Sequence, residues 1–356
     1  MKRWIKESIV LPWLTREERK AAKAARISSL FIELTNRCNF NCDFCANRFM
    51  KREKRHMDFN LACNILDEVS KEKIVDRIFP HFVGEPFLYP YLFEFLEKAQ
   101  GKGIPIELFT NGSLLDEKGI KRLYELNIKR LLLSFQTPDK ISFAFRHAPL
   151  SFDEFLRKTE SIIENKFIGN FSTEIEIQFL STCKTSPRGS VHSLETVDEV
   201  KEAFSLFERF SRELSKRFHL DRNSLHPPVV KDIPPSGKRF KILPGVEIYF
   251  RHACLWNNPL ELLGPGIEIK NRDRGWCIFP FQMLLILSSG EATCCCMDYD
   301  GEINLGNIRD KSIKDIWFGE KLSRMRADMK KMVLSQGVCR RCRGKVTGAR
   351  KKDILK

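Results

Sequence analysis

The sequence predicts an α/β protein in which a partial (βα)6 barrel is followed by a smaller α+β domain. Between residues 29 and 218, strand-length apolar segments alternate with helix-length amphipathic segments. This alternation is typical of parallel strands joined by covering helices. Beyond residue 270 the pattern changes to a hairpin and a helix. The expected parts are a basic N-terminal extension over 1–27, the barrel over 28–250, a linker over 251–269 and the C-terminal domain over 270–356.

The strands and helices of the barrel are assigned from their hydrophobic periodicity, which is two residues in a strand and about 3.6 in a helix. Strands are expected over 29–34, 77–83, 105–109, 129–135, 174–180 and 246–250. Helices are expected over 60–72, 92–101, 117–126, 152–166 and 197–218. Residues 219–245 are rich in Pro and contain a Ser-Gly pair, so a loop is predicted there.

In the C-terminal domain, apolar residues 283–287, a Ser-Gly turn and residues 292–297 predict a hairpin. A single helix is expected from residue 312 to about residue 333, and Cys339 and Cys342 follow it. Because active sites of parallel barrels lie at the carboxyl ends of the strands, the chemistry is expected in the loops at those ends.

The composition allows a large core and excludes a mostly disordered chain, because 42% of the residues are hydrophobic and 30% are charged. No apolar run approaches the ~20 residues that a membrane span requires. Charges at Lys6 and Glu7 interrupt any signal-like segment near the start. We therefore expect a cytoplasmic protein without a membrane span.

The twelve cysteines are the most informative residues, and nine of them fall into two clusters. Cys63, Cys183 and Cys254 stand alone and are expected to be small buried residues. A long chain without an export signal favours metal or redox chemistry over a disulfide framework.

The first cluster is Cys38-Asn-Phe-Asn-Cys42-Asp-Phe-Cys45, in a loop that directly follows the first predicted strand. Three thiolates can hold three corners of an iron–sulfur cube, which leaves the fourth iron without a protein ligand. A structural zinc site would need a fourth ligand, which His56 or Cys63 could supply. Both kinds of site are open at this point.

This spacing of the three cysteines resembles the motif of the radical S-adenosylmethionine (radical SAM) superfamily. The segment Val83-Gly84-Glu85-Pro86, after the second predicted strand, resembles the Gly-Gly-Glu-Pro turn of that family, with Val83 in place of the first glycine. The resemblance implies a radical SAM barrel in which the open iron binds the amine and carboxylate of SAM. One electron then cleaves SAM to a 5′-deoxyadenosyl radical, which abstracts a hydrogen atom from the substrate.

The same resemblance implies positions for the SAM contacts. We expect an aromatic residue near adenine and a turn at the SAM amine. We also expect a Thr-Asn-Gly turn, and polar groups near the ribose and near a carboxylate. These positions are Phe44, Gly84, Glu85, Pro86, Asn111, Ser134, Gln136 and Arg146. No residue is assigned as the catalytic acid, base or hydrogen donor.

The second cluster resembles the C-terminal auxiliary-cluster domain called SPASM, or its shortened form called twitch. In that pattern a cysteine precedes a hairpin, another lies five residues after the turn glycine, and a Cys-x-x-Cys comes later. The implied ligands are Cys277, Cys295, Cys339 and Cys342, with Cys294 and Cys296 as alternates to Cys295. Because no cysteine follows Cys342 in this sequence, one auxiliary [4Fe–4S] cluster is expected, which makes two with the SAM-binding cluster. A zinc ribbon with four cysteine ligands is the alternative.

By resemblance, an auxiliary cluster held by four thiolates suits electron transfer in the oxidation of a small molecule such as a sugar or an aminocyclitol. A peptide-modifying maturase is the alternative within the family. It is less favoured because only 37 residues precede Cys38, whereas such enzymes often carry a separate leader-peptide domain. A hypothesis of another class is a zinc-stapled RNA-binding or scaffold protein.

The net charge of +15 calls for an acidic partner or reflects solvated helix faces. Because the basic residues are scattered and no RNA-binding module is evident, a nucleic-acid partner is not expected. The expected protein partner is an acidic flavodoxin or ferredoxin that docks and supplies the electron.

Overall fold

The fold is that of a computed structural model, which describes residues 26–181, 197–220, 239–252 and 268–347. Several predictions fall outside the described residues. They concern the N-terminal extension except its last two residues, most of the linker, Cys183 and Cys254. Cys63 lies on a helix and is partly exposed, so the prediction that it is buried is wrong.

The strands lie close to their predicted positions. In chain order they are β1 (Ser29–Ile32), β2 (Ile78–Phe79), β3 (Glu107–Thr110), β4 (Arg130–Gln136), β5 (Glu174–Ser181), β6 (Arg239–Leu243), β7 (Val246–His252), β8 (Glu268–Lys270), β9 (Met283–Ile286), β10 (Glu291–Thr293), β11 (Gly306–Asn307) and β12 (Lys345–Thr347). The six predicted barrel strands correspond to β1–β5 and β7.

The helices alternate with the barrel strands as predicted. They are α3 (Phe59–Glu72), α4 (Leu92–Gly101), α5 (Glu117–Glu125), α6 (Lys140–Ala144), α7 (Phe152–Ile168), α8 (Val197–Arg217), α10 (Phe279–Gln282), α11 (Ile313–Phe318), α12 (Glu320–Lys330) and α13 (Gly337–Cys342), with 3-10 turns η2 (Ala46–Arg48) and η3 (Pro86–Leu88). Within the described ranges, no helix is long and apolar enough to cross a membrane.

The strands form two five-stranded sheets with the orders β11-β10-β9-β1-β2 and β3-β4-β5-β7-β6, and β8 pairs with β12 in a separate two-stranded sheet. A parallel bridge between Ile78 and Ile106 joins β2 to the start of the second sheet. Strands β1–β2 and β3–β4–β5–β7 are parallel, which confirms the predicted α/β class. The described strands do not close on themselves, so the barrel is partial, as predicted.

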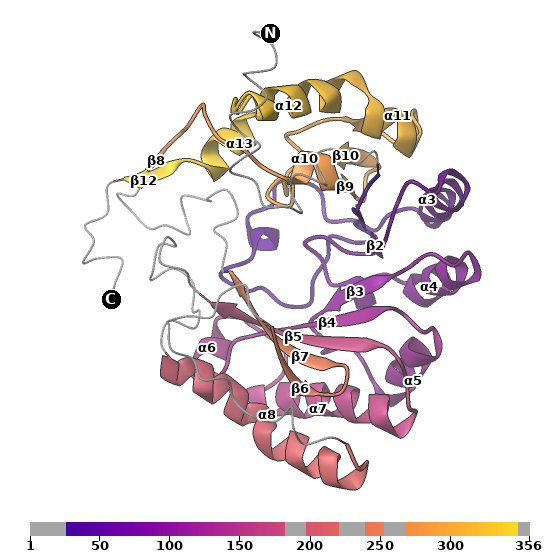
Figure 1. The fold of residues 1–356 in the computed structure, drawn as a ribbon, viewed down its shortest axis with the longest axis vertical. Helices are drawn as coiled ribbons and strands as arrows, with labels where there is room; N and C mark the ends of the chain where they lie inside the picture. The colour runs from indigo at the N-terminus through magenta and orange to yellow at the C-terminus, as the bar shows by residue number, and fades with distance from the viewer. Residues whose placement is uncertain (1–25, 182–196, 221–238, 253–267, 348–356) are drawn as a thin grey trace, which may run out of the picture.

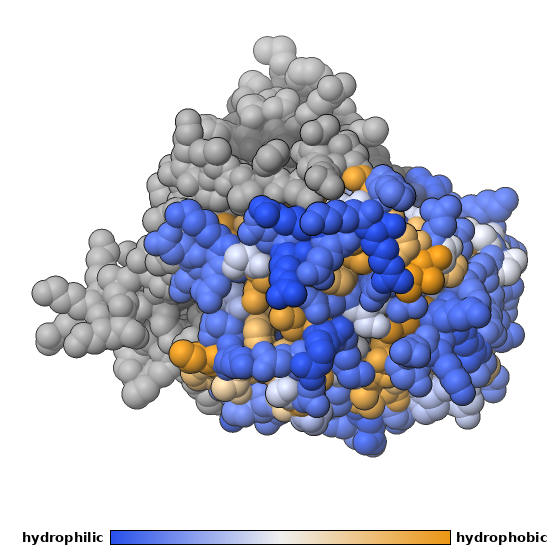
Figure 2. Space-filling view, turned by 90° about the horizontal axis from the view of Figure 1, so that it is seen from below, coloured by the Kyte–Doolittle hydropathy of each residue, from blue (hydrophilic) through white to orange (hydrophobic). Residues whose placement is uncertain are grey.

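Helices α5, α7 and α8 lie on the outer side of β3–β7, while α10–α13 lie at the opposite end of the molecule (Figure 1). Helix α7 starts with a capping box in which Ser151 and Glu154 satisfy each other's backbone N–H groups. Its apolar face is buried, with Phe155 1% and Ile163 0% exposed. Seen from below, the surface on the side of these helices is mostly hydrophilic, with small separated hydrophobic groups (Figure 2). Burial of its apolar face therefore holds α7 against the sheet.

Two predicted segments differ from the structure. The predicted loop over 219–245 contains β6, which pairs antiparallel with β7 through a turn where Gly245 has a φ of 68°. The turn signal was present, but the strand before it is short and half polar. The predicted helix over 312–333 is two helices broken at Gly319, where a Cβ would lie 2.6 Å from the Asp315 carbonyl oxygen.

The hairpin of the predicted C-terminal domain continues the first sheet of the barrel. Strand β9 runs parallel to β1, with Ser29 opposite Met283 and Ile32 opposite Ile286. All four residues of β9 are buried. The loop with the first cysteine cluster and the segment 294–296 therefore both leave strands of one sheet, β1 and β10.

Candidate functional site

A cavity of about 320 Å³ lies at the carboxyl ends of the barrel strands. All three cysteines of the first cluster line it. The expected SAM contacts that also line it are Phe44, Gly84, Glu85, Asn111, Ser134, Gln136 and Arg146. Pro86 does not line the cavity and instead starts η3 as a buried residue.

The turn at Gly84 is pressed against the segment that leads into the first cysteine. A Cβ on Gly84 would lie 2.2 Å from the Thr35 carbonyl oxygen, so no larger residue fits without movement. The Glu85 backbone N–H donates to the Arg37 carbonyl at 2.8 Å. Val83 is buried, and its carbonyl accepts from the Asn47 side chain at 2.8 Å. The turn and the cysteine loop therefore form one unit.

The Glu85 carboxylate organises the loop after β3. It accepts from the Thr110 hydroxyl at 2.7 Å, from the Asn111 backbone N–H at 2.8 Å and from the Phe87 backbone N–H at 3.2 Å. Burial raises the pKa of Glu85 to about 7, and these hydrogen bonds oppose that rise. Asn111 donates to the Asn39 side chain at 3.0 Å, so it too ties this loop to the cysteine loop.

The three thiols lie in surroundings that do not favour their ionised form. Burial raises the pKa of Cys38 to about 12 and that of Cys45 to about 12, and it also raises the pKa of Cys42. The Cys45 sulfur nevertheless accepts a backbone N–H, from Asn47 at 3.4 Å. Because metals bind thiolates and deprotonate buried thiols, this donor set fits a metal cluster that supplies positive charge.

Arg146 brings a positive charge to the same cavity. Its side chain is almost fully buried, donates to the Phe135 carbonyl at 2.7 Å and lies 4.8 Å from the Phe40 ring centroid. Its Nε has no hydrogen-bond partner among the described residues. A buried donor without a partner costs about 1–3 kcal/mol, a cost that a ligand accepting from this atom would remove.

Ser134 and Gln136 are brought together at the end of β4. Gln136 has a left-handed backbone with a φ of 65°, where the register between β4 and β5 shifts. Its side-chain amide donates to the Ser134 hydroxyl. The bulge therefore turns a polar pair toward the cavity that both residues line.

Three cysteines of the second cluster are buried, whereas Cys277 and Cys296 are partly exposed and Cys342 is exposed. Cys294, Cys295 and Cys339 are 0%, 8% and 8% exposed, and burial raises the pKa of each thiol. The charges of Cys277 and Cys339 act on Cys294, and that of Cys277 acts on Cys295. Cys296 instead lines the cavity of the first cluster.

The local hydrogen bonds distinguish the neighbouring cysteines. The Cys295 sulfur accepts the Met297 backbone N–H at 3.4 Å, the same arrangement and distance as Cys45 with Asn47. The Cys277 sulfur likewise accepts a backbone N–H, from Phe279. The Cys294 sulfur lies 3.6 Å from the Met325 sulfur. Backbone N–H groups favour thiolates, so Cys295 has the better surroundings for a ligand.

A mononuclear zinc site is not formed by the part of the chain that the structure describes. No three His, Cys, Asp or Glu residues there converge as one metal ion requires. Neither His56 nor Cys63, the fourth ligands of the zinc alternative, lines the cavity. An iron–sulfur cube spreads its thiolates over separate irons, so it accepts cysteines that lie further apart.

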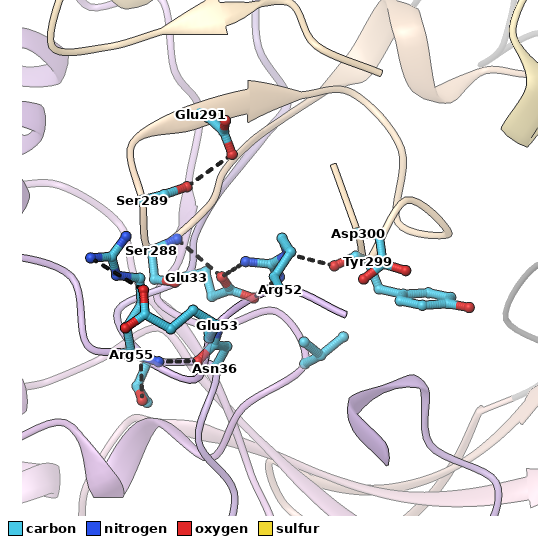
Figure 3. A network of polar contacts seen from close by, with 12 residues as sticks. Glu33, Asn36, Arg52, Glu53, Arg55, Ser288, Ser289, Glu291, Tyr299 and Asp300 are labelled. Atoms are coloured by element: carbon cyan, nitrogen blue, oxygen red, sulfur yellow. Dashed lines mark hydrogen bonds and ion pairs between the residues drawn. The ribbon is translucent and has the colours of Figure 1, made fainter. Parts of the chain in front are cut away.

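An ion-pair network that the sequence did not reveal joins the two cysteine regions (Figure 3). Glu33, at the end of β1, is fully buried and accepts from both terminal nitrogens of Arg52 at 2.8 Å. Glu33 also accepts the Ser288 backbone N–H at 3.0 Å, and Arg52 Nε donates to the Tyr299 carbonyl at 2.7 Å. The segment after the first cysteines is thus held to the C-terminal hairpin.

Other cavity residues were also missed by the sequence analysis. They are Phe31, Phe40, His81, Phe82, Phe109, Leu180, Arg251, Phe279 and Met283. The position of His81 and Arg251 near strand ends was a usable signal, because such positions face the mouth of a parallel barrel.

Two family profiles match the chain. The profile described as "Radical SAM superfamily" matches residues 32–175. The SPASM profile, described as "Iron-sulfur cluster-binding domain", matches residues 277–343. Together the two matches take in more than half of the chain and include both cysteine clusters.

Two curated proteins illustrate the sequence similarity. A "Tungsten-containing aldehyde ferredoxin oxidoreductase cofactor-modifying protein" of Pyrococcus furiosus is 23% identical over 309 residues, which cover 82% of this chain and 81% of that protein. An "S-adenosyl-L-methionine-dependent 2-deoxy-scyllo-inosamine dehydrogenase" of Niallia circulans is 32% identical over 33% of this chain. That match spans 48% of the dehydrogenase, less than half of its length.

A solved structure has a similar fold. It is described as "Streptococcus suis SuiB bound to precursor peptide SuiA", with a TM-score of 0.57 at 14% identity. The match covers 91% of this chain and 78% of that one. At this identity the likeness concerns the fold alone.

Proposed function

The chain belongs to the radical SAM superfamily and is an enzyme, and from this premise we propose that Cys38, Cys42 and Cys45 hold a [4Fe–4S] cluster whose fourth iron binds SAM. The observation that carries the proposal is the cavity, which the three cysteines line together with the Gly84-Glu85 turn. When bound and reduced, such a cluster supplies the electron that cleaves SAM to a 5′-deoxyadenosyl radical, which abstracts a substrate hydrogen atom.

The residues of this chain would bind and orient SAM beside that cluster. Glu85 holds the turn and the Asn111 loop in place, because three donors already occupy its carboxylate. The unpartnered Nε of Arg146 would meet a carboxylate in the cavity. Ser134 and Gln136 would face the ribose and Phe44 the adenine. Aromatic side chains also line the cavity.

The second cluster is proposed to be one auxiliary [4Fe–4S] cluster held by Cys277, Cys295, Cys339 and Cys342, which gives two clusters in all. Cys295 is preferred to Cys294 because its sulfur accepts a backbone N–H as the Cys45 sulfur does. Cys296 faces the first cavity and is the less suited alternate. Four thiolates would leave no open iron, and such a cluster suits electron transfer.

The proposed reaction is the oxidation or modification of a small molecule such as a sugar or an aminocyclitol. The name of the dehydrogenase relative supports a small substrate. A peptide substrate is the second candidate, supported by the fold likeness to a protein described with a precursor peptide. A flavodoxin or ferredoxin is proposed as the electron donor, and a location in the cytoplasm stays a prediction.

The experiment is anaerobic reconstitution with iron and sulfide, followed by iron counting and a dithionite-driven SAM cleavage assay. We expect about eight irons in the wild type and about four in a variant with Cys38, Cys42 and Cys45 changed to Ala. Deoxyadenosine should form only with the wild type. Cys63→Ala is the control, because Cys63 lies on α3 outside both clusters. Zinc in place of iron, with intact SAM, would contradict the proposal.

A further inference from the structure

One end of the cavity carries polar groups that the binding of SAM does not account for. We call this end the His81 corner and define it by His81, Phe109 and Arg251, which all line the cavity. His81 follows β2, Phe109 lies in β3 and Arg251 lies in β7. Three separate strands of the barrel therefore contribute one residue each.

The side chains of His81 and Arg251 both lie close to the Phe109 ring. The His81 and Phe109 rings have centroids 4.9 Å apart, and the Arg251 guanidinium lies 5.6 Å from the Phe109 centroid. His81 Nδ1 is buried and has no hydrogen-bond partner among the described residues. A buried polar atom facing a cavity in this way points to a ligand that completes its hydrogen bonding.

The corner carries a positive charge in surroundings of low polarity. Burial, assisted by the charge of Arg251, lowers the pKa of His81 to about 3, so the imidazole is neutral. The charge at this corner therefore comes from Arg251. Phe31, whose ring lies 5.7 Å from His81, and Met283 form the apolar surroundings, in which a charged hydrogen bond is strengthened.

The carboxylate of the cavity is engaged away from this corner. Among the described lining residues, Glu85 is the single carboxylate, and its oxygens accept three hydrogen bonds from the loop after β3 and from η3. Arg146 serves the cysteine end, because its charge acts on Cys42. The charge of Arg251 thus acts on His81 and that of Arg146 on Cys42, two different groups that line the cavity.

We infer that the His81 corner binds an anionic group of the substrate, a carboxylate or a phosphate, through Arg251 and the neutral imidazole of His81. This inference rests on the proposed function and narrows its substrate class to acid-bearing molecules, such as a sugar acid or a sugar phosphate. The acid held at the corner orients the rest of the molecule toward the cysteine end, where its C–H bond is attacked. Guanidinium groups recognise both acids through paired hydrogen bonds.

The test uses the reconstituted full-length protein loaded with SAM and titrated calorimetrically with three small probes. Inorganic phosphate and malonate represent the two acids, and glycerol is the uncharged control. Arg251→Gln removes the charge, and His81→Phe keeps an aromatic ring without its nitrogens. Arg122→Gln is the matched control, because Arg122 also lies over a phenylalanine, 4.5 Å from the Phe93 centroid, but outside the cavity.

We expect the wild type to bind at least one anion and not glycerol, and the tighter anion identifies the acid. Arg251→Gln should weaken anion binding by about tenfold or more. The affinity for SAM and the melting temperature should stay unchanged, and Arg122→Gln should behave as the wild type. Anion binding by a wild type that does not bind SAM would support the corner and contradict the proposed function. A wild type that binds SAM but no anion, or an unchanged affinity in Arg251→Gln, would overturn the inference.

Discussion

The two cysteine clusters of this protein differ in how they lie relative to the cavity. Cys38, Cys42 and Cys45 are partly exposed and line a cavity of about 320 Å³. In the second cluster Cys296 lines this cavity, and the other described cysteines do not. Of those, Cys294, Cys295 and Cys339 are buried, Cys277 is partly exposed and Cys342 is exposed. Thiols that line a cavity can hold a cluster that also accepts a ligand, whereas thiols away from the cavity suit a cluster that only passes electrons. Position relative to the cavity, rather than the number of cysteines, distinguishes the two regions.

Removing one cysteine from each cluster tests the difference between the two regions most directly. Cys45→Ala should lower SAM cleavage by at least about a thousandfold, because the open iron site is lost with the first cluster. Cys339→Ala should retain SAM cleavage while substrate oxidation is lost. Deoxyadenosine is measured by chromatography after reduction with dithionite. Equal loss of SAM cleavage in both variants would contradict the division of roles.

The second prediction separates Cys295 from Cys294. Cys295→Ala should lose about four irons, because it removes a cluster ligand, while Cys294→Ala should keep them. Truncating the buried Cys294 side chain leaves a small cavity, and about 1 kcal/mol of unfolding free energy should be lost. Iron is counted in anaerobically reconstituted protein. The reverse pattern would assign the ligand to Cys294.

The third prediction concerns the ion pair that joins the two regions. Glu33→Gln leaves the Arg52 guanidinium, 12% exposed, without its carboxylate, and should lower the free energy of unfolding by about 3–5 kcal/mol. Glu97→Gln is the matched control, because it removes the partner of Arg122 at the surface and should cost less than about 1 kcal/mol. Urea unfolding measures both. Equal effects would mean that the Glu33 pair does not hold the regions together.

The fourth prediction is a pH dependence that comes from Glu85, in the first region. The pKa of Glu85 is raised from its ordinary value of 4.5 to about 7, so between these values the folded protein binds more protons than the unfolded chain. The free energy of unfolding should therefore fall as the pH rises through this window, by roughly 3 kcal/mol in total. Comparison with Glu85→Gln isolates this contribution. The same slope in the variant would assign it to other groups.

The sequence predicted those helix bounds that are set by residues next to one another in the chain. Helix α4 has the predicted bounds, because its apolar spacing and the glycine at its end are both visible in the sequence. The break at Gly319 was missed because helical charge spacing continues across it, while the extended backbone there depends on close packing against Asp315.

In the candidate site, too, contiguous motifs were predicted and contacts between distant residues were not. The three cysteines and the Gly84 turn were predicted because the motif is contiguous, and the structure brings them to one cavity. Glu33 could not be paired with Ser288 from the sequence, because the two are 255 residues apart and meet through the pairing of β1 with β9. Arg251 was missed for a similar reason, since its contact with Phe109 joins distant strands.

The most direct test of the central claim is electron–nuclear double resonance of the reduced protein with SAM labelled with ¹⁵N at its amine. The Cys339→Ala variant would contain only the first cluster, and the Cys38/Cys42/Cys45→Ala variant only the second. We predict a strong ¹⁵N coupling in the first variant and none in the second, because Cys38, Cys42 and Cys45 all line the cavity that is proposed to hold SAM. Coupling to the second cluster, or none to either, would contradict the account.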